Sequence, residues 1–307
     1  YAKKRPATGA WGRSCLRNGT ALAALVAAGN SAGWAQSTVT IYGIVDSAVQ
    51  YGKFNDTVSP TAMAASGNLQ ASRFGLLGKE DLGGGYRANF RLETGFNLYS
   101  GMGGGATAFN RGASVGLSGP FGSVDAGYLY LPIYWVFLAS DVATYGLSNP
   151  AAIMSLEHTT TLGKSGTGGF YPNAVRYRTP NFNGLSGEIG YSFGAQNAAG
   201  QTADGRNIGM NVMYQRFGMI LGYGVNRYQY YANTPTLTPS SQLTQMFAAT
   251  YAYSGNFIGA NYIYSKRTDA ANWFASALLV NAKIPAGPGD IELGVARRIE
   301  NANARAM

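Results

Sequence analysis

RFGLLGKEDLGGGYRANFRLETGFN, residues 73–97, is the stretch that decides the fold. From Tyr86 to Glu93 it alternates, with apolar side chains at even positions and polar ones at odd positions. A period of two is typical of a β-strand whose two faces meet different surroundings. The polar face carries Arg87, Arg91 and Glu93, and aromatic rings lie near both ends of the apolar face. This pattern favours a strand with lipid on one side and water on the other.

A tight polar turn precedes that strand. Residues 80–85 read EDLGGG, and the three consecutive glycines can supply the positive φ angles that short hairpins need. The stretch is therefore expected to form an antiparallel hairpin.

The composition points the same way. Charged residues make up 12% of the 307 residues, about half the share of roughly 25% found in soluble domains. The mean hydropathy is nevertheless only −0.07, and after residue 35 no apolar run reaches the roughly 18 residues of a membrane helix. The missing charge is replaced by polar residues, 43 Gly and 21 Tyr. A barrel with an apolar exterior and a polar interior is expected to have this average composition. A soluble β-solenoid or β-sandwich can have the same composition.

Residues 1–35 are expected to be a secretory signal peptide. They combine basic residues with a short apolar core at residues 20–28, and Gly33-Trp34-Ala35 resembles a small-x-small cleavage site before Gln36. A transmembrane anchor is the alternative, but the apolar core has about half the length needed. Because the chain starts with Tyr1 rather than Met, its true beginning is expected to lie upstream. Five of the 23 Lys and Arg lie here, which leaves 18 basic against 14 acidic residues, or +4, for the rest. That modest charge argues against nucleic acid as a partner.

Alternation recurs along most of the remaining chain. The segments expected to be strands are 38–51, 86–98, 109–119, 123–130, 173–179, 185–193, 206–215, 219–231, 245–254 and 256–266, with weaker candidates at 273–284 and 290–298. Residues 273–280 would also fit a helix, and a loop is expected around Pro60. Short turns, such as Pro120–Gly122 and Phe217-Gly218, alternate with longer connections. Up-and-down membrane barrels show this alternation of turn lengths.

Residues 131–172 interrupt the alternation. This segment is about 40 residues long, well beyond an ordinary connection, and its first part, LPIYWVFLASDVATYGL, is apolar and aromatic. Such a segment is expected to fold back against the protein as a lid or as a plug inside a barrel.

Several motifs together resemble the Gram-negative trimeric porins of the β-proteobacterial general diffusion type. The motifs are AQSTVTIYG (35–43), the SRFG…EDLGGG…LE run (72–93), FNRGASVGLSGPFGSV (109–124), VRYRTPNFNGLSG (175–187) and YSKRTD (264–269). The resemblance implies an all-β transmembrane antiparallel up-and-down β-barrel of 16 strands, with residues 36–307 as a single porin domain. It also implies a homotrimer in outer-membrane lipid of a Gram-negative cell, a constriction loop within 131–172 that folds into the lumen, and passive diffusion of small hydrophilic solutes and ions.

The sequence departs from that family in three respects. The family usually has a basic residue in the strand before the constriction loop, about where Tyr128 stands here. Only about twelve or thirteen strands can be counted, and the chain ends NANARAM (301–307) without the family's terminal aromatic residue, so the barrel is expected to be truncated. The acidic motif of the constriction loop is also missing, and only Asp141 and Glu157 could supply its charge.

Charged residues at the polar positions of the alternating strands, and in the long segment 131–172, are candidates to line a pore. They are Arg73, Arg87, Arg91, Arg111, Arg176, Arg178, Glu93, Asp141 and Glu157. Basic side chains on a wall opposite acids on a loop set up a transverse field across a pore. Because the loop acids are few, the arginines should dominate and the pore should prefer anions. The alternative is that these arginines are solvated or pair locally, for example Arg91 with Glu93.

Other functions find little support in the sequence. An enzyme would need His158, the one histidine, as its base, and no G-x-S-x-G motif is present. A secreted adhesin or β-solenoid would need a repeat of about 20–50 residues, which is absent. No cofactor or metal site is expected, since Cys15, the one cysteine, lies in the signal segment. A substrate-specific outer-membrane channel remains the closest alternative to a general diffusion pore.

Overall fold

The computed structural model describes residues 37–52, 61–67, 70–103, 108–142, 170–194, 205–232, 238–268 and 273–301. All of them belong to the compact unit Ser37–Met307. The predicted signal segment, His158 and Glu157 lie outside the described residues. Among the described residues, no helix is long and apolar enough to cross a membrane.

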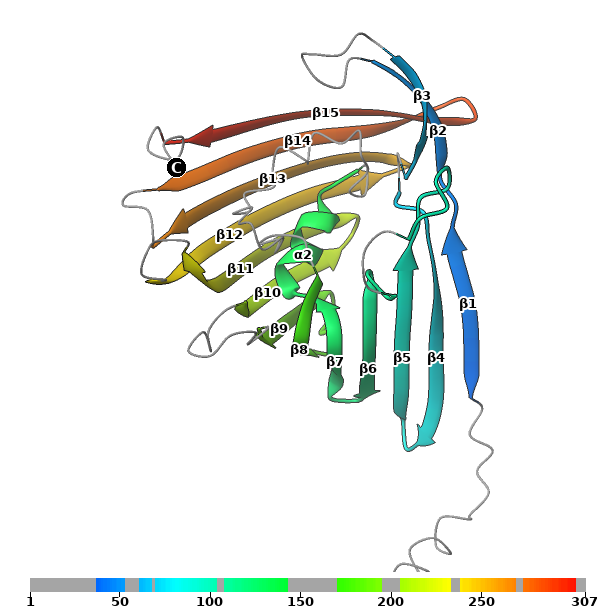
Figure 1. Ribbon diagram of the computed structural model, residues 1–307, viewed down its shortest axis with the longest axis vertical. Helices are drawn as coiled ribbons and strands as arrows, with labels where there is room; N and C mark the ends of the chain where they lie inside the picture. Colours follow the sequence, from blue (N-terminus) through cyan, green and yellow to red (C-terminus); the bar gives the residue numbers. More distant parts are fainter. Residues whose placement is uncertain are drawn as a thin grey trace, which may run out of the picture. The chain divides into compact units, whose positions relative to one another are not determined.

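The described chain forms a 13-stranded antiparallel sheet, in agreement with the twelve or thirteen strands expected from the sequence (Figure 1). In order across the sheet, the strands are β1 (Thr38–Ile44), β4 (Arg73–Gly83), β5 (Tyr86–Gly95), β6 (Gly112–Gly119), β7 (Gly122–Tyr130), β8 (Phe170–Arg178), β9 (Leu185–Phe193), β10 (Arg206–Arg216), β11 (Met219–Ala232), β12 (Thr238–Tyr253), β13 (Asn256–Arg267), β14 (Phe274–Ala286) and β15 (Gly289–Glu300). From β4 onward each strand pairs with the next one along the chain. Between β1 and β4 the chain forms a separate two-stranded sheet, β2 (Ser47–Gly52) with β3 (Thr61–Ser66).

The two faces of the sheet carry opposite chemistry. Large apolar side chains at alternate positions are exposed on the outer face, including Ile41 at 77%, Val115 at 64% and Phe247 at 52%. The other parity, here called the inner face, holds buried polar side chains such as Asn211 and Asn281. A soluble sheet would show the reverse arrangement. This distribution is that of strands with lipid outside and a polar interior.

The three glycines at residues 83–85 have φ angles of 82°, 60° and 82°, which confirms the role predicted for them, and two further hairpin turns show the same feature. Phe217 and Gly218 have φ angles of 55° and 75°, and Ser254 and Gly255 have φ angles of 51° and 83°. Positive φ at both central residues is the geometry of the type I′ turn, whose twist matches that of the paired strands. These turns fix the registers of β10 with β11 and of β12 with β13.

Two segments differ from the sequence-based expectation. Residues 38–51 form two strands rather than one, because the chain breaks near Asp46, whose carboxylate accepts a hydrogen bond from the Gln70 backbone N–H at 3.0 Å. Residues 61–66, expected to be part of a loop, form β3. Residues 273–284, a weaker strand candidate whose first part would also fit a helix, form β14 from Phe274 onward, which confirms the strand.

The sheet curves around one helix, α2 (Pro132–Ala139), which lies in the apolar segment expected to fold back (Figure 1). Proline at the first turn of a helix is tolerated because that N–H needs no partner within the helix. Ile133, Val136 and Phe137 pack in one buried cluster with inner-face residues that include Met246 and Ile263. The inner face is therefore apolar where α2 lies on it.

Glycines in β11 allow α2 to approach the sheet closely. A Cβ added at Gly224 would lie 3.1 Å from a Val136 methyl and 3.2 Å from Ile133 Cγ1, and one at Gly222 would lie 3.1 Å from Val136. These distances are tighter than ordinary contacts between carbon atoms. Small residues at these two positions are thus needed for α2 to lie where it does.

The substitution Gly224→Leu should displace α2. Overpacking of this kind costs about 1–3 kcal/mol, and we expect a loss of that size in the free energy of unfolding, measured by urea titration of the chain folded in detergent. Ala249→Leu, on the exposed face of β12, is the matched control and should have little effect. Equal losses for the two variants would contradict the placement of α2.

Candidate pore constriction

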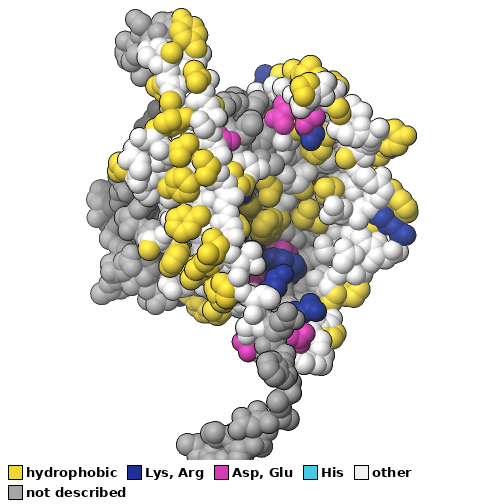
Figure 2. Space-filling model, turned by 90° about the vertical axis from the view of Figure 1, so that its right-hand side faces the viewer, with side chains coloured by type: hydrophobic (Ala, Val, Ile, Leu, Met, Phe, Trp, Pro, Cys, Tyr) yellow, Lys and Arg dark blue, Asp and Glu magenta, His cyan; other side chains and the backbone are white. Residues whose placement is uncertain are grey.

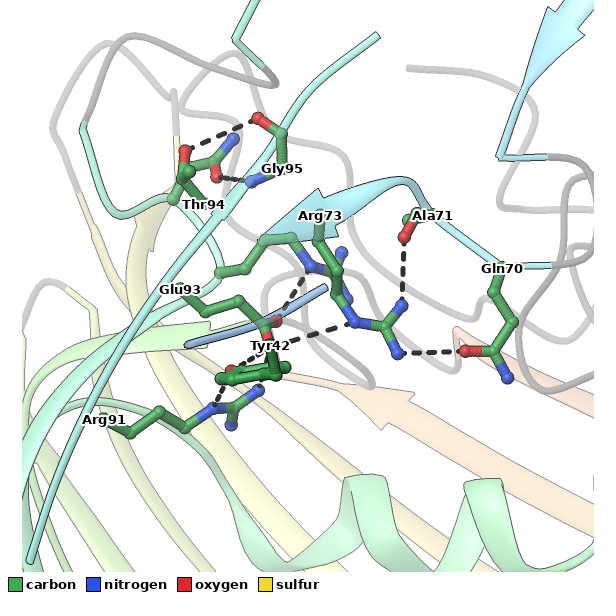
Figure 3. A network of polar contacts seen from close by, with 10 residues as sticks. Tyr42, Gln70, Ala71, Arg73, Arg91, Glu93, Thr94 and Gly95 are labelled. Carbon is green, nitrogen blue, oxygen red and sulfur yellow. Dashed lines mark hydrogen bonds and ion pairs between the residues drawn. The ribbon is translucent and has the colours of Figure 1, made fainter. Parts of the chain in front are cut away.

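Three arginines of the inner face share one carboxylate. Glu93 Oε2 lies 2.8 Å from Arg91 Nη2 and 3.8 Å from Arg73 Nε, and Glu93 Oε1 lies 3.0 Å from Arg111 Nε. The Tyr42 hydroxyl also donates to Glu93 (Figure 3). The Glu93 side chain is 1% exposed, so the four partners enclose it.

Glycines beside Glu93 explain how side chains from four segments reach it. In the sheet register Glu93 lies opposite Gly75 of β4 on one side and opposite Gly112 of β6 on the other. A Cβ at Gly75 would lie 2.7 Å from the Tyr42 hydroxyl oxygen, so the tyrosine of β1 crosses β4 only because this position is glycine. Arg111 immediately precedes Gly112 and reaches Glu93 from the β6 side.

The arginine cluster (Arg73, Arg91 and Arg111 around Glu93) carries surplus positive charge. Three guanidinium groups face one carboxylate, which leaves two positive charges uncompensated within the cluster. Among the described residues, Arg91 Nη1 and both Nη atoms of Arg111 have no hydrogen-bond partner. Their N–H groups are available to an anion, and guanidinium–anion hydrogen bonds are stronger than neutral ones.

An aromatic surface, rather than an acidic one, lies across from the arginine cluster. Tyr134, Trp135 and Leu138 of α2 and Tyr130 of β7 line, together with the three arginines, one cavity of about 330 Å³. The Tyr130 and Tyr134 rings stack at 3.8 Å between centroids with 3° between their planes, and Trp135 meets Tyr134 edge-on at 5.3 Å. Figure 2 shows a hollow in which basic and hydrophobic side chains lie next to each other.

Polar side chains of the inner face hold both ends of α2. The donors are Asn211 of β10, Thr250 of β12, Asn261 of β13 and Asn281 of β14. Asn211 Nδ2 donates to the Pro132 carbonyl at 2.7 Å, and Thr250 Oγ1 donates to the Ala139 carbonyl at 2.8 Å. Asn281 and Asn261 bind the carbonyl and the hydroxyl of Ser140 at 2.8 and 2.9 Å. The carbonyls of the last turn of a helix lack partners within it, and Thr250 and Asn281 supply donors to those of Ala139 and Ser140.

These contacts to α2 could not be predicted from the sequence. The asparagines lie at the polar positions of the alternating pattern. A wall lined by water would show the same pattern, so the pattern does not indicate that a helix binds there. Their roles depend on where α2 lies, and that position is set by packing.

Arg176 and Arg178 pair locally, which was the alternative left open by the sequence. Arg176 Nη2 lies 3.0 Å from Asp125 Oδ2, and Arg178 Nε lies 2.6 Å from Glu188 Oε1. Arg176 also donates to the Tyr130 carbonyl, and its guanidinium carbon lies 5.8 Å from the centroid of the Trp135 ring. Two acids therefore balance these two arginines, and Arg176 supports the aromatic surface.

The remaining sequence candidates lie elsewhere. Arg87 is exposed near the β4–β5 turn, opposite Asp81 in register. Asp141 follows α2 with 3% exposure and does not line the cavity of the arginine cluster. Glu157 lies outside the described residues. In the part of the chain that the structure describes, no group of His, Cys, Asp or Glu side chains could hold a metal ion.

Comparisons with known proteins agree on one family. A family model described as Gram-negative porin matches residues 21–306. Outer membrane porin protein 32 of Delftia acidovorans is 38% identical over 205 residues, which is 63% of this chain and 54% of the relative. An outer membrane porin protein of Bordetella pertussis is 35% identical over 192 residues, which is 56% of this chain and 47% of the relative. The chain thus spans about half the length of the curated relatives it matches.

Solved structures show the same fold. An anion-selective porin from Comamonas acidovorans superposes with a TM-score of 0.77 at 24% identity, over 87% of this chain and 80% of that one. OmpT of Vibrio cholerae superposes with a TM-score of 0.63 at 15% identity, over 87% of this chain and 77% of that one. At these identities the likeness concerns the fold alone.

Glu93→Gln should destabilise the protein, because it leaves three arginines around a neutral side chain. Removing one partner of a buried ion pair typically costs about 3–5 kcal/mol, and urea titration in detergent measures the loss. Glu80→Gln, at an exposed position of β4, is the control and should change stability by less than about 0.5 kcal/mol. If Glu93→Gln is as well tolerated as Glu80→Gln, the shared carboxylate does not hold the cluster together.

Proposed function

The chain belongs to the Gram-negative porin family, and on that premise we propose that it forms a water-filled pore for passive diffusion of small hydrophilic solutes and ions, with a preference for anions. As a family member it is a β-barrel protein of the outer membrane of Gram-negative bacteria. Its relatives are named as porins, and the function proposed is accordingly passage rather than catalysis.

The single observation that carries the anion preference is the arginine cluster. Two uncompensated positive charges line a cavity of about 330 Å³ beside α2. Two unit charges 4 Å apart interact by about 1 kcal/mol even in water. Each surplus charge therefore lowers the energy of an anion in the gap and raises that of a cation.

The proposed arrangement of the whole protein follows from the family. Residues 1–35 act as a signal peptide, residues 36–307 form one barrel domain, and the constriction lies within residues 131–172. The domain assembles as a homotrimer in outer-membrane lipid. The exposed apolar outer face of the sheet supports contact with lipid.

A substrate-specific channel is the second candidate. The observation that favours it is the aromatic surface of α2, since a purely general pore needs only polar walls. Aromatic side chains add contacts that depend on the shape and chemistry of the solute.

Reversal potentials under a potassium chloride gradient test the anion preference. We expect the chain in a planar bilayer to favour chloride, and Arg111→Gln to lower the ratio of anion to cation permeability roughly fivefold, the effect of about 1 kcal/mol. Arg111→Lys keeps the charge and should keep the ratio.

A second control is Arg87→Gln, which removes an exposed charge away from the cavity. It should change the ratio less than Arg111→Gln does. Cation preference in the unmodified chain would refute the role of the cluster, and the absence of channel events would refute the pore itself.

A further inference from the structure

The surface of α2 that meets the arginine cluster carries no charge. The helix reads PIYWVFLA, and its cavity-lining residues Tyr134, Trp135 and Leu138 fall on one side of a helical wheel. Asp141, the nearest described acid along the chain, does not line this cavity. Two walls of different chemistry therefore face one gap, with cationic hydrogen-bond donors on one and aromatic rings on the other.

The aromatic wall is held in place before any solute arrives. Tyr130 stacks on Tyr134, Trp135 packs edge-on to both tyrosines, and Arg176 lies over the Trp135 ring while it binds the Tyr130 carbonyl. The other side of α2 is buried against β10–β12. A preformed surface binds a solute without first losing conformational freedom.

The cationic wall has the donors that a carboxylate needs. Both Nη atoms of Arg111 and Nη1 of Arg91 have no partner among the described residues. A guanidinium group binds a carboxylate through two parallel N–H···O bonds. The cavity, at about 330 Å³, lies at the lower end of the size range of small-molecule sites, which is about 300–1,000 Å³. It suits a solute with one ring rather than a larger molecule.

We propose that this constriction is a binding site for aromatic carboxylates, single planar rings that bear one carboxylate. The carboxylate binds Arg111 and Arg91, and the ring contacts Tyr134 and Trp135. An inorganic anion meets only the cationic wall, an aliphatic acid lacks the contact between aromatic rings, and a neutral aromatic solute lacks the bonds to the arginines. The proposal deepens the anion preference proposed above and shares the arginine cluster with it.

Equilibrium binding to the full chain folded in detergent tests the site without requiring conduction. Calorimetry compares benzoate with cyclohexanecarboxylate, which has the same charge and nearly the same size but no aromatic ring. We expect benzoate to bind roughly two- to tenfold more tightly, the contribution typical of an aromatic pair. Arg111→Gln should weaken both acids by similar factors.

Variants of α2 distinguish a contact between aromatic rings from nonspecific hydrophobic binding. Tyr134→Leu and Trp135→Leu should bring the ratio of the two affinities close to one while leaving the affinity for cyclohexanecarboxylate nearly unchanged. Tyr251→Leu, on the exposed outer face at 50% exposure, is the matched control and should keep the ratio. The retained affinity for cyclohexanecarboxylate also reports that each variant is folded.

Each outcome bears on one proposal. Equal affinities for the two acids, or a benzoate preference that survives both helix variants, would overturn the aromatic carboxylate site even if the pore conducts chloride. A benzoate preference that requires Tyr134 and Trp135 would support the site even if no channel events occur, in which case the proposed pore alone fails.

Discussion

The requirement that strands in lipid present apolar side chains outward and polar ones inward is the constraint on which the structure depends. It makes each strand two-faced, exposes residues such as Ile41 and Phe247, and turns asparagine, serine and arginine into the interior. The polar interior then supplies both the contacts that hold α2 and the charges that face it. Fold and candidate function thus arise from one pattern of alternation.

The placement of α2 depends on a local reversal of that pattern. An uncharged apolar helix would be poorly placed on a polar wall, and the wall beneath it is accordingly built from Met246, Ile263 and glycines at 222 and 224. Hydrogen bonds from sheet side chains reach the backbone of the α2 segment at Pro132, where the helix begins, and at Ala139 and Ser140, where it ends. This arrangement directs Tyr134 and Trp135 toward the arginine cluster and creates a gap with one cationic and one aromatic wall.

Much of the fold could be predicted from the sequence, because strict alternation and glycine turns are local signals. The hairpin at residues 73–97 and the pairing of Arg91 with Glu93, two residues apart on one face, are examples. β3 escaped prediction because TAMAAS has almost no polar–apolar contrast. The pairing of Arg176 with Asp125 depends on the register of β7 with β8, which the long connection between them leaves undetermined. Likewise, only tertiary packing brings Arg111 and α2 to the cluster.

The position of a bound anion tests the central claim, that uncompensated positive charge at the arginine cluster faces α2. A crystal structure of the chain in bromide, with its anomalous scattering recorded, would locate that anion directly. We expect a bromide peak within hydrogen-bond distance of the Arg111 and Arg91 guanidinium groups, on the side that faces Tyr134. A structure with no bromide at these arginines, or with α2 away from β11, would contradict the claim.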